Sequence, residues 1–236
     1  MLPVIILAGG LATRLRPITE VIPKALIPIS GKPFIFHQLE YLKSQGIQNV
    51  VISIGYLGDQ IQNTVGDGRL FGLEIKYSQD GDVLLGTGGA IKKALSLLGP
   101  SFFVLYGDSF LPIKYLPIKD AFNRVNISCL MTVMRNYNQW DKSNVIFEKD
   151  NLILYNKKEP TSRMHHIDYG LGILKAPVFD IYPAGKPFDL SEVYNQLSIK
   201  QDIYGYEVFE RFYEIGSPKG IRDMESFLQD FEGNKL

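Results

Sequence analysis

The sequence has a single cysteine, no excess charge of either sign and no long hydrophobic run. Cys129 has no second cysteine for a disulfide and lies in the apolar segment "ISCLMTV", so we expect a buried small side chain in a reducing, cytoplasmic environment. The 25 Lys and Arg residues balance 25 Asp and Glu residues, which leaves no general attraction to nucleic acid or to an anionic membrane. No apolar run approaches the roughly 20 residues of a membrane-spanning helix, and we expect no signal peptide.

The first half of the chain alternates strand patterns with helix patterns. Short apolar runs lie at 4–7, 49–56, 73–79 and 101–109. The segments between them have helical spacing and end at glycines. This order predicts an α/β fold, with a doubly wound, mixed but mostly parallel sheet and helices on both faces.

The second half has a more mixed pattern and contains no linker rich in glycine, serine or proline. Strand patterns lie at 127–135, 143–149, 152–158 and 169–174, with two short ones between 204 and 217. Helices are expected over 189–198 and from Pro218 onward. We therefore expect one domain over 1–236, in which the second half forms a small lid or substrate platform on the first.

The glycine-containing segment "LAGGLATRLRPITEVIPKAL" follows the first strand pattern and spans 7–26. It fits neither G-x-G-x-x-G nor G-x-x-x-x-G-K-[ST]. Its small residues would still let backbone amides approach phosphate oxygens, and Arg14, Arg16 and Lys24 could supply cationic donors. A glycine-rich turn kept only for steric reasons is the alternative.

Asp108 lies at the end of the strand pattern at 101–109, and the 9–14 loop follows the first strand pattern. Ligands of such sheets bind beyond the carboxyl ends of the strands. The loop and Asp108 are therefore expected to face one crevice, despite lying about a hundred residues apart.

The motif "LAGGLATRLRPIT…PKALIPI" resembles the signature of sugar-1-phosphate nucleotidyltransferases, G-G-x-G-T-R-L-x-P-x-T followed by P-K. The resemblance continues through "GKPFIFHQLEYLKSQGI", "LGTGGAI", "LYGDS" and "YEIGSP". Ala12 stands where the family has a third loop glycine, and the loop tolerates it only if this position needs no positive φ. The resemblance implies a Rossmann-like domain with a nucleotide-binding half, 1–112, and a sugar-phosphate-binding half, 113–236.

The resemblance also implies a set of site residues. The catalytic candidates are Arg14, Lys24 and Asp108. The nucleotide-binding candidates are Leu7, Ala8, Gly9, Gly10, Thr13, Arg14, Gln79 and Gly88. For Gly88 the alternative is the entry turn of a helix, and for Arg14 and Lys24 an ordinary surface cation.

Two carboxylates are the candidates for a Mg²⁺ cofactor. Asp108 is the first, and its alternative role is to cap a turn. The family's D-x-G-[TS] element reads Glu214-Ile215-Gly216-Ser217 here, so Glu214 is the second. On the sugar-phosphate side the resemblance points to Lys158, Asp168 and Gly170, with Asp168 in place of the family's asparagine.

The resemblance implies a transferase whose partners are a nucleoside triphosphate and a sugar 1-phosphate, as a possible homo-oligomer. The loop sequence most resembles guanylyltransferases for mannose or manno-heptose phosphates, so GTP is the favoured triphosphate. A uridylyltransferase for an amino-sugar phosphate, such as N-acetylmuramate 1-phosphate, is the alternative enzyme. A non-catalytic regulator that binds a nucleotide sugar is the alternative outside catalysis.

Overall fold

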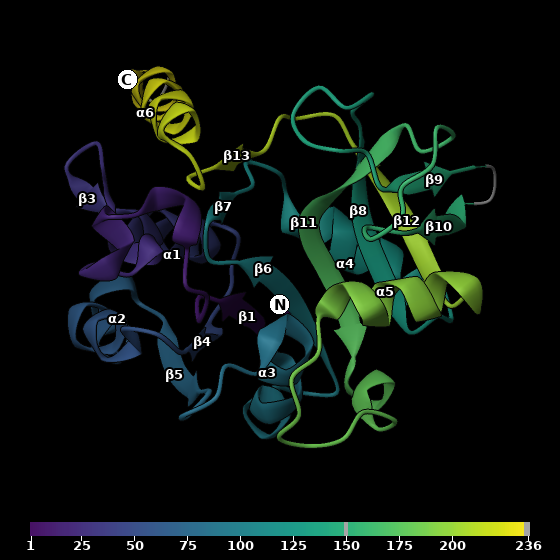
Figure 1. Cartoon of the computed structure of the whole chain (residues 1–236), viewed down its shortest axis with the longest axis horizontal. Helices are drawn as coiled ribbons and strands as arrows, with labels where there is room; N and C mark the ends of the chain where they lie inside the picture. The colour runs from purple at the N-terminus through teal and green to yellow at the C-terminus, as the bar shows by residue number, and fades with distance from the viewer. Residues whose placement is uncertain (149–150, 234–236) are drawn as a thin grey trace.

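The computed structural model describes residues 1–148 and 151–233, and within them one large mixed sheet forms the centre of the molecule (Figure 1). Its strands are β1 (Val4–Leu7), β4 (Asn49–Ile54), β5 (Glu74–Gln79), β6 (Ser101–Tyr106), β8 (Cys129–Arg135), β9 (Val145–Phe147), β10 (Ile153–Tyr155), β11 (His166–Lys175) and β12 (Ile203–Val208). Two small sheets pair β2 (Pro28–Ile29) with β3 (Lys32–Pro33), and β7 (Ser109–Phe110) with β13 (Tyr213–Glu214). The mixed α/β class predicted from the sequence is confirmed.

Helices cover both faces of the sheet. On one face, buried side chains of α1 (Phe34–Ser44), α2 (Gly58–Val65) and α4 (Tyr115–Arg124) pack on the strands. On the other face, α3 (Gly86–Ala94) and α5 (Leu190–Ile199) do the same, and Cys129 is buried in the same hydrophobic cluster. None of the described helices is long and apolar enough to cross a membrane.

The strand order places a topological switch point at β1. Strands β6, β1, β4 and β5 are parallel neighbours, with β4 on one side of β1 and β6 on the other. In a parallel sheet, a crevice opens beyond the carboxyl ends of the strands at the point where the strand order reverses. The fold therefore directs Leu7, Ser53 and Tyr106, which lie side by side near the carboxyl ends of three adjacent strands, toward one site.

The second half of the chain extends the same sheet. The long strand β11 pairs antiparallel with β6, and β8 and β12 continue the sheet beyond it. Helix α4, which contains a proline, was not predicted from the sequence. Pro117 lies in the first turn of α4, where proline removes no intrahelical hydrogen bond.

Helix α6 (Pro218–Gly233) lies apart from the layers, at the upper left in Figure 1, and contacts β13 and β2. Its buried Met224 and Leu228 belong to a hydrophobic cluster with Leu15, Phe110 and Ile215. Leu15 directly follows Arg14, and Ile215 directly follows Glu214. Phe110 lies two residues after Asp108. Helix α6 therefore supports the back of the segments that carry candidate site residues.

Candidate active site

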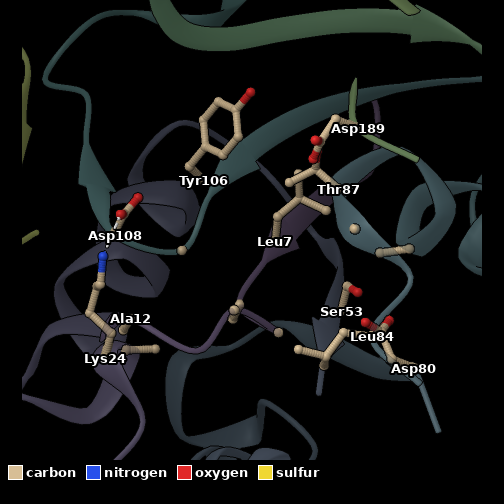
Figure 2. Close-up of a pocket in the computed structure, with 17 residues that line it drawn as sticks. Leu7, Ala12, Lys24, Ser53, Asp80, Leu84, Thr87, Tyr106, Asp108 and Asp189 are labelled. Carbon is tan, nitrogen blue, oxygen red and sulfur yellow. Dashed lines mark hydrogen bonds and ion pairs between the residues drawn. The ribbon is translucent and has the colours of Figure 1, made fainter. Parts of the chain in front are cut away.

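A pocket lies at the switch point, beyond the ends of β1, β4 and β6 (Figure 2). Leu7, Ser53 and Tyr106 line the pocket near the strand ends. The loop 9–14, hereafter the glycine loop, forms part of its wall through Gly9, Gly10 and Ala12. Gly9 packs so closely on the neighbouring strand end that a Cβ there would lie 3.2 Å from Gly55 N. Glycine at position 9 is therefore required by the packing of the loop on the end of β4, which is a steric role, whereas a Cβ on Gly10 would meet no described atom within 4 Å.

Lys24 and Asp108 meet at one end of this pocket. Lys24 Nζ donates a hydrogen bond of 2.9 Å to Asp108 Oδ2, across 84 residues of sequence (Figure 2). The Lys24 side chain is 16% exposed and that of Asp108 is 30% exposed, so both can still be reached from the cavity. The expectation that the loop region and Asp108 face one crevice is therefore met by the geometry.

The turn after Asp108 brings the carboxyl-terminal segment to the same place. Strand β13 pairs antiparallel with β7, with Glu214 opposite Ser109, and Ile215 N donates a 2.9 Å hydrogen bond to Asp108 O. The backbones that carry Asp108 and Glu214 are therefore adjacent, although Glu214 is not part of the pocket wall. Its Oε2 accepts a hydrogen bond of 3.1 Å from Gly216 N.

Arg14 also reaches this turn. Its Nη2 atom lies 3.1 Å from the point where a Cβ on Gly216 would stand. Arg14 is exposed, and within the described part of the chain it has neither a hydrogen-bond partner nor an ion-pair partner. It remains a free cation at the edge of the site.

The other end of the pocket is formed by Ser53, Leu84 and Asp80 (Figure 2). Asp80 is 9% exposed, and its Oδ2 accepts a 3.1 Å hydrogen bond from Leu85 N. Burial raises the pKa of the Asp80 carboxyl, while the hydrogen bond from Leu85 and the charge of Lys93 act in the opposite direction. The hydroxyl of Ser53 is buried and, among the described residues, has no hydrogen-bond partner.

Gln79 and Gly88 are not in the pocket wall. Gln79 is exposed, whereas its neighbour Asp80 is buried and lines the cavity. Gly88 packs under an aromatic ring, because a Cβ there would lie 2.4 Å from two ring carbons of Phe188. The ring of Phe188, which lies just before α5, therefore excludes a larger side chain at position 88, and the nucleotide-binding role of Gly88 stays a prediction.

The three candidates for the sugar-phosphate side also lie outside this pocket. Lys158 is exposed and forms a 3.0 Å ion pair with Glu192 at a separate hollow beside α5. Asp168 Oδ1 accepts a 3.0 Å hydrogen bond from Gly170 N, at an irregularity in the β11–β8 pairing. Burial raises the pKa of Asp168 to about 6, and the charge of Lys157 opposes this shift.

Six of the residues singled out from the sequence line the cavity. They are Leu7, Ala8, Gly9, Gly10, Lys24 and Asp108. Thr13 and Arg14 are exposed beside it. Ala12, noted in the sequence as the replacement for a loop glycine, also lines the cavity. Sequence reasoning missed the other wall residues, namely Ala25, Ser53, Asp80, Leu84, Gly86, Thr87, Ala90, Tyr106, Gly107 and Asp189.

Ala12 adopts the left-handed conformation that favours glycine, with φ of 48°. The loop was expected to tolerate alanine at this position only if no positive φ is needed, and this condition is not met. The strained conformation is held by hydrogen bonds to the Ala12 carbonyl, 2.8 Å from Thr19 Oγ1 and 3.1 Å from Leu15 N. The left-handed region costs an alanine about 1–2 kcal/mol.

Ala12→Gly is expected to stabilise the protein. Glycine removes the strain of the left-handed conformation but raises the conformational entropy of the unfolded chain. We therefore expect the free energy of unfolding to rise by about 0.5–1 kcal/mol. Urea unfolding measures this gain, with Ala121→Gly as the control. Ala121 lies inside α4, where the same exchange should destabilise by about 1 kcal/mol. A loss of stability in Ala12→Gly would contradict the observed backbone conformation.

Comparison with known proteins agrees with this geometry. A family model described as nucleotidyl transferase matches residues 3–144. The chain is 32% identical to D-glycero-alpha-D-manno-heptose 1-phosphate guanylyltransferase of Campylobacter jejuni over 219 residues, which cover 91% of this chain and 95% of that protein. It is 41% identical to N-acetylmuramate alpha-1-phosphate uridylyltransferase of Neisseria meningitidis, but over only 111 residues, 47% of this chain and 48% of that protein.

A solved structure gives the same result for the fold. HddC from Yersinia pseudotuberculosis, in a crystal structure complexed with GMP-PN, superposes with a TM-score of 0.79 and 26% identity, covering 97% of this chain and all of that chain. The Rossmann-like fold is thereby confirmed. The chain belongs to the nucleotidyl transferase family, and its relatives and fold identify it as a sugar-1-phosphate nucleotidyltransferase.

Proposed function

We propose that this enzyme transfers a guanylyl group from GTP to a sugar 1-phosphate of the manno-heptose or mannose type. An oxygen of the sugar phosphate attacks the α-phosphorus of GTP, and the bond from that phosphorus to the oxygen bridging to the β-phosphate breaks. The products are a GDP-sugar and pyrophosphate. The observation that carries the proposal is that the glycine loop, Lys24 and Asp108 line one pocket, in a chain alike over 91% of its length to a manno-heptose 1-phosphate guanylyltransferase.

Members of this family generally use a divalent metal, and the residues present fit Mg²⁺. No group of three or more His, Cys, Asp or Glu side chains converges within the described residues. Mg²⁺ bound with substrate phosphates needs only one or two carboxylates, and Asp108 and Glu214 lie on adjacent backbones. These two would hold the ion, which when bound neutralises charge on the reacting phosphates.

Charge balance in the pocket supports the metal. The described wall residues include three carboxylates, Asp80, Asp108 and Asp189, and one cation, Lys24. A triphosphate entering such a wall would meet more negative than positive charge. We infer that a divalent cation must accompany it.

Lys24 and Arg14 would supply the remaining positive charge. Lys24 Nζ, held beside Asp108, would stabilise the charge that develops at the α-phosphate. Arg14 would hold the β- and γ-phosphates and steady the departing pyrophosphate, and amides of the loop through Gly9, Gly10 and Thr13 would contact phosphate oxygens.

On the acceptor side we assign the sugar 1-phosphate to the region of Asp168, Gly170 and Lys158. The ionised Asp168 carboxyl can accept hydrogen bonds from sugar hydroxyls but cannot donate. Lys158 would have to leave its ion pair with Glu192 to reach a phosphate. The charge of Lys157, which already acts on Asp168, offers a second cation on the same turn.

Asp80 favours guanine over uracil as the base. An ionised carboxylate only accepts hydrogen bonds, and the guanine edge offers adjacent N1–H and N2–H donors. Uracil offers one N–H between two carbonyl oxygens, which a carboxylate repels. The uridylyltransferase alternative keeps one specific support, the 41% identity to N-acetylmuramate alpha-1-phosphate uridylyltransferase over 47% of this chain.

Pyrophosphate release tests the function directly. The chain is incubated with Mg²⁺, each common nucleoside triphosphate, and manno-heptose, mannose, glucose or N-acetylmuramate 1-phosphate. Release is expected with GTP and a manno-configured sugar phosphate. Turnover only with UTP and N-acetylmuramate 1-phosphate would establish the alternative, and no release with any pair would overturn both.

Asp80→Asn is expected to lower kcat/KM for GTP by about tenfold or more, since a hydrogen bond to a charged group contributes about 1.5–3 kcal/mol. The rate with UTP should fall less or rise, because the amide no longer repels carbonyl oxygens. Asp82→Asn is the matched control, as Asp82 lies exposed on the same loop. An unchanged ratio of GTP to UTP rates in Asp80→Asn would refute the base assignment.

A further inference from the structure

Gln38 is a buried amide on α1 that reaches the backbone behind the site. Its side chain is 2% exposed. The Nε2 atom donates to Tyr106 O at 2.9 Å and to Ser109 O at 2.7 Å. These two carbonyls stand on either side of Gly107 and Asp108, so one side chain grips both ends of the turn that presents the Asp108 carboxylate.

The orientation of this amide is unambiguous. Both partners are carbonyl oxygens, which can only accept, so the nitrogen of Gln38 must face them. The opposite atom, Gln38 Oε1, is buried and has no hydrogen-bond partner in the described part of the chain. A buried unpaired acceptor costs about 1–3 kcal/mol, and an apolar side chain of the same size would avoid that cost but would leave the carbonyl oxygens of Tyr106 and Ser109 without this donor. Packing alone therefore does not account for an amide at this position.

The remaining restraints on the turn come from the backbone. Gly107 N donates to Leu7 O at 2.9 Å, and Ile215 N donates to Asp108 O at 2.9 Å. Gly107 also packs tightly on the glycine loop, because a Cβ there would lie 2.8 Å from Leu7 O. These contacts fix the turn against β1 and β13. The hydrogen bonds of Gln38 add a third restraint, which connects the turn to α1.

We propose that Gln38 is a positioning residue for Asp108, setting the place of the metal-binding carboxylate relative to the glycine loop. The inference rests on the proposed function, in which Asp108 holds Mg²⁺. A misplacement of about 1 Å in a reacting constellation can cost 100-fold in rate. Loss of the Gln38 hydrogen bonds would free both flanking carbonyls and let the carboxylate shift.

Gln38→Met tests the proposal, because methionine keeps the length of the side chain and removes both hydrogen bonds. Two quantities are measured: kcat with GTP and the sugar phosphate, and the dissociation constant of Mn²⁺ by electron paramagnetic resonance with a non-hydrolysable GTP analogue. We expect kcat to fall about tenfold or more and Mn²⁺ to bind at least about fivefold more weakly. KM for GTP should stay within about threefold, since the loop and the base end are untouched.

Tyr41→Phe is the matched control. Tyr41 lies one turn further along α1, and its hydroxyl donates 3.0 Å to Ile113 O, a carbonyl beyond the Asp108 turn. It should leave Mn²⁺ affinity and kcat near those of the wild type. Equal losses in Tyr41→Phe and Gln38→Met would overturn the proposal, because they would show a general effect of loosening α1. If Gln38→Met does not fold, Gln38→Asn, too short to reach both carbonyls, is judged by the same criteria.

Asp108→Asn separates this inference from the proposed function. If Mn²⁺ binding is lost in Asp108→Asn but unchanged in the Gln38 variants, Gln38 has no positioning role and the metal assignment stands. If Mn²⁺ binding is unchanged in Asp108→Asn, the metal role fails and the inference fails with it. Weakened Mn²⁺ binding in both, with Tyr41→Phe unaffected, supports the positioning role.

Discussion

Asp108→Asn is expected to lower kcat about 1000-fold while leaving the fold intact. Metal stabilisation of phosphate charge is worth several kcal/mol, and each 1.36 kcal/mol changes a rate tenfold. Asparagine has the size of aspartate, so the turn between β6 and β7 keeps its backbone bonds to Leu7 and Ile215. The neutral amide, however, is a poor ligand for Mg²⁺.

The loss is measured as steady-state pyrophosphate release, with thermal unfolding to establish that the variant folds. Asp67→Asn serves as the control, because Asp67 is an exposed carboxylate whose partner is Arg69 at 3.0 Å on the surface. It should keep its full rate. Asp108→Asn turning over at the rate of Asp67→Asn would mean that Asp108 is only a turn residue.

Lys24→Met is expected to lower kcat about 100-fold, the scale for removing one preorganised charge donor. Methionine retains much of the apolar stem, so packing of the half-buried side chain is largely kept. Lys32→Met is the control, because Lys32 is an exposed lysine that pairs with Glu40 at 3.3 Å. A rate near normal in Lys24→Met would show that Lys24 does not face the reacting phosphate.

The same variant has an opposite effect on the metal. Lys24 Nζ lies 2.9 Å from Asp108 Oδ2 and competes with any cation for that carboxylate. Titration with Mn²⁺ should therefore show affinity equal to or tighter than wild type in Lys24→Met, and weaker in Asp108→Asn. Weaker Mn²⁺ binding in Lys24→Met would indicate that the lysine helps to hold the metal complex together.

Much of the fold was predictable because the first half alternates strand and helix patterns without interruption. That alternation requires a parallel sheet, and parallel strands bring their carboxyl ends to one edge. This is why the loop after β1 and the turn after β6 could be placed in one crevice from sequence. In the structure Gly9, Gly10 and Asp108 line one pocket.

Other parts of the site could not be read from the pattern. Gln79 and Asp80 are adjacent at the end of β5, and side chains of adjacent residues point to opposite faces, so the sequence pattern does not show that Asp80 lines the cavity while Gln79 is exposed. Asp189 enters the pocket from the start of α5, about a hundred residues beyond Thr87, which its carboxylate contacts at 3.4 Å. Nothing in the sequence around Thr87 or Asp189 predicts that these two residues are in contact.

Backbone and packing demands were equally hidden. The sequence motif around Gly88 does not show that the ring of Phe188 packs against this glycine. Ala12 replaces a family glycine, and only the backbone angle shows that the position still requires positive φ. The sequence therefore did not reveal the steric reasons for a small residue at positions 12 and 88.

The most direct measurement is a crystal structure of this chain with Mg²⁺ and a non-hydrolysable GTP analogue. We expect phosphates against the 9–14 loop, the metal bound by an Asp108 carboxylate oxygen, and the base beside Asp80. Phosphates bound elsewhere, or Asp108 still paired with Lys24 and remote from the metal, would contradict it.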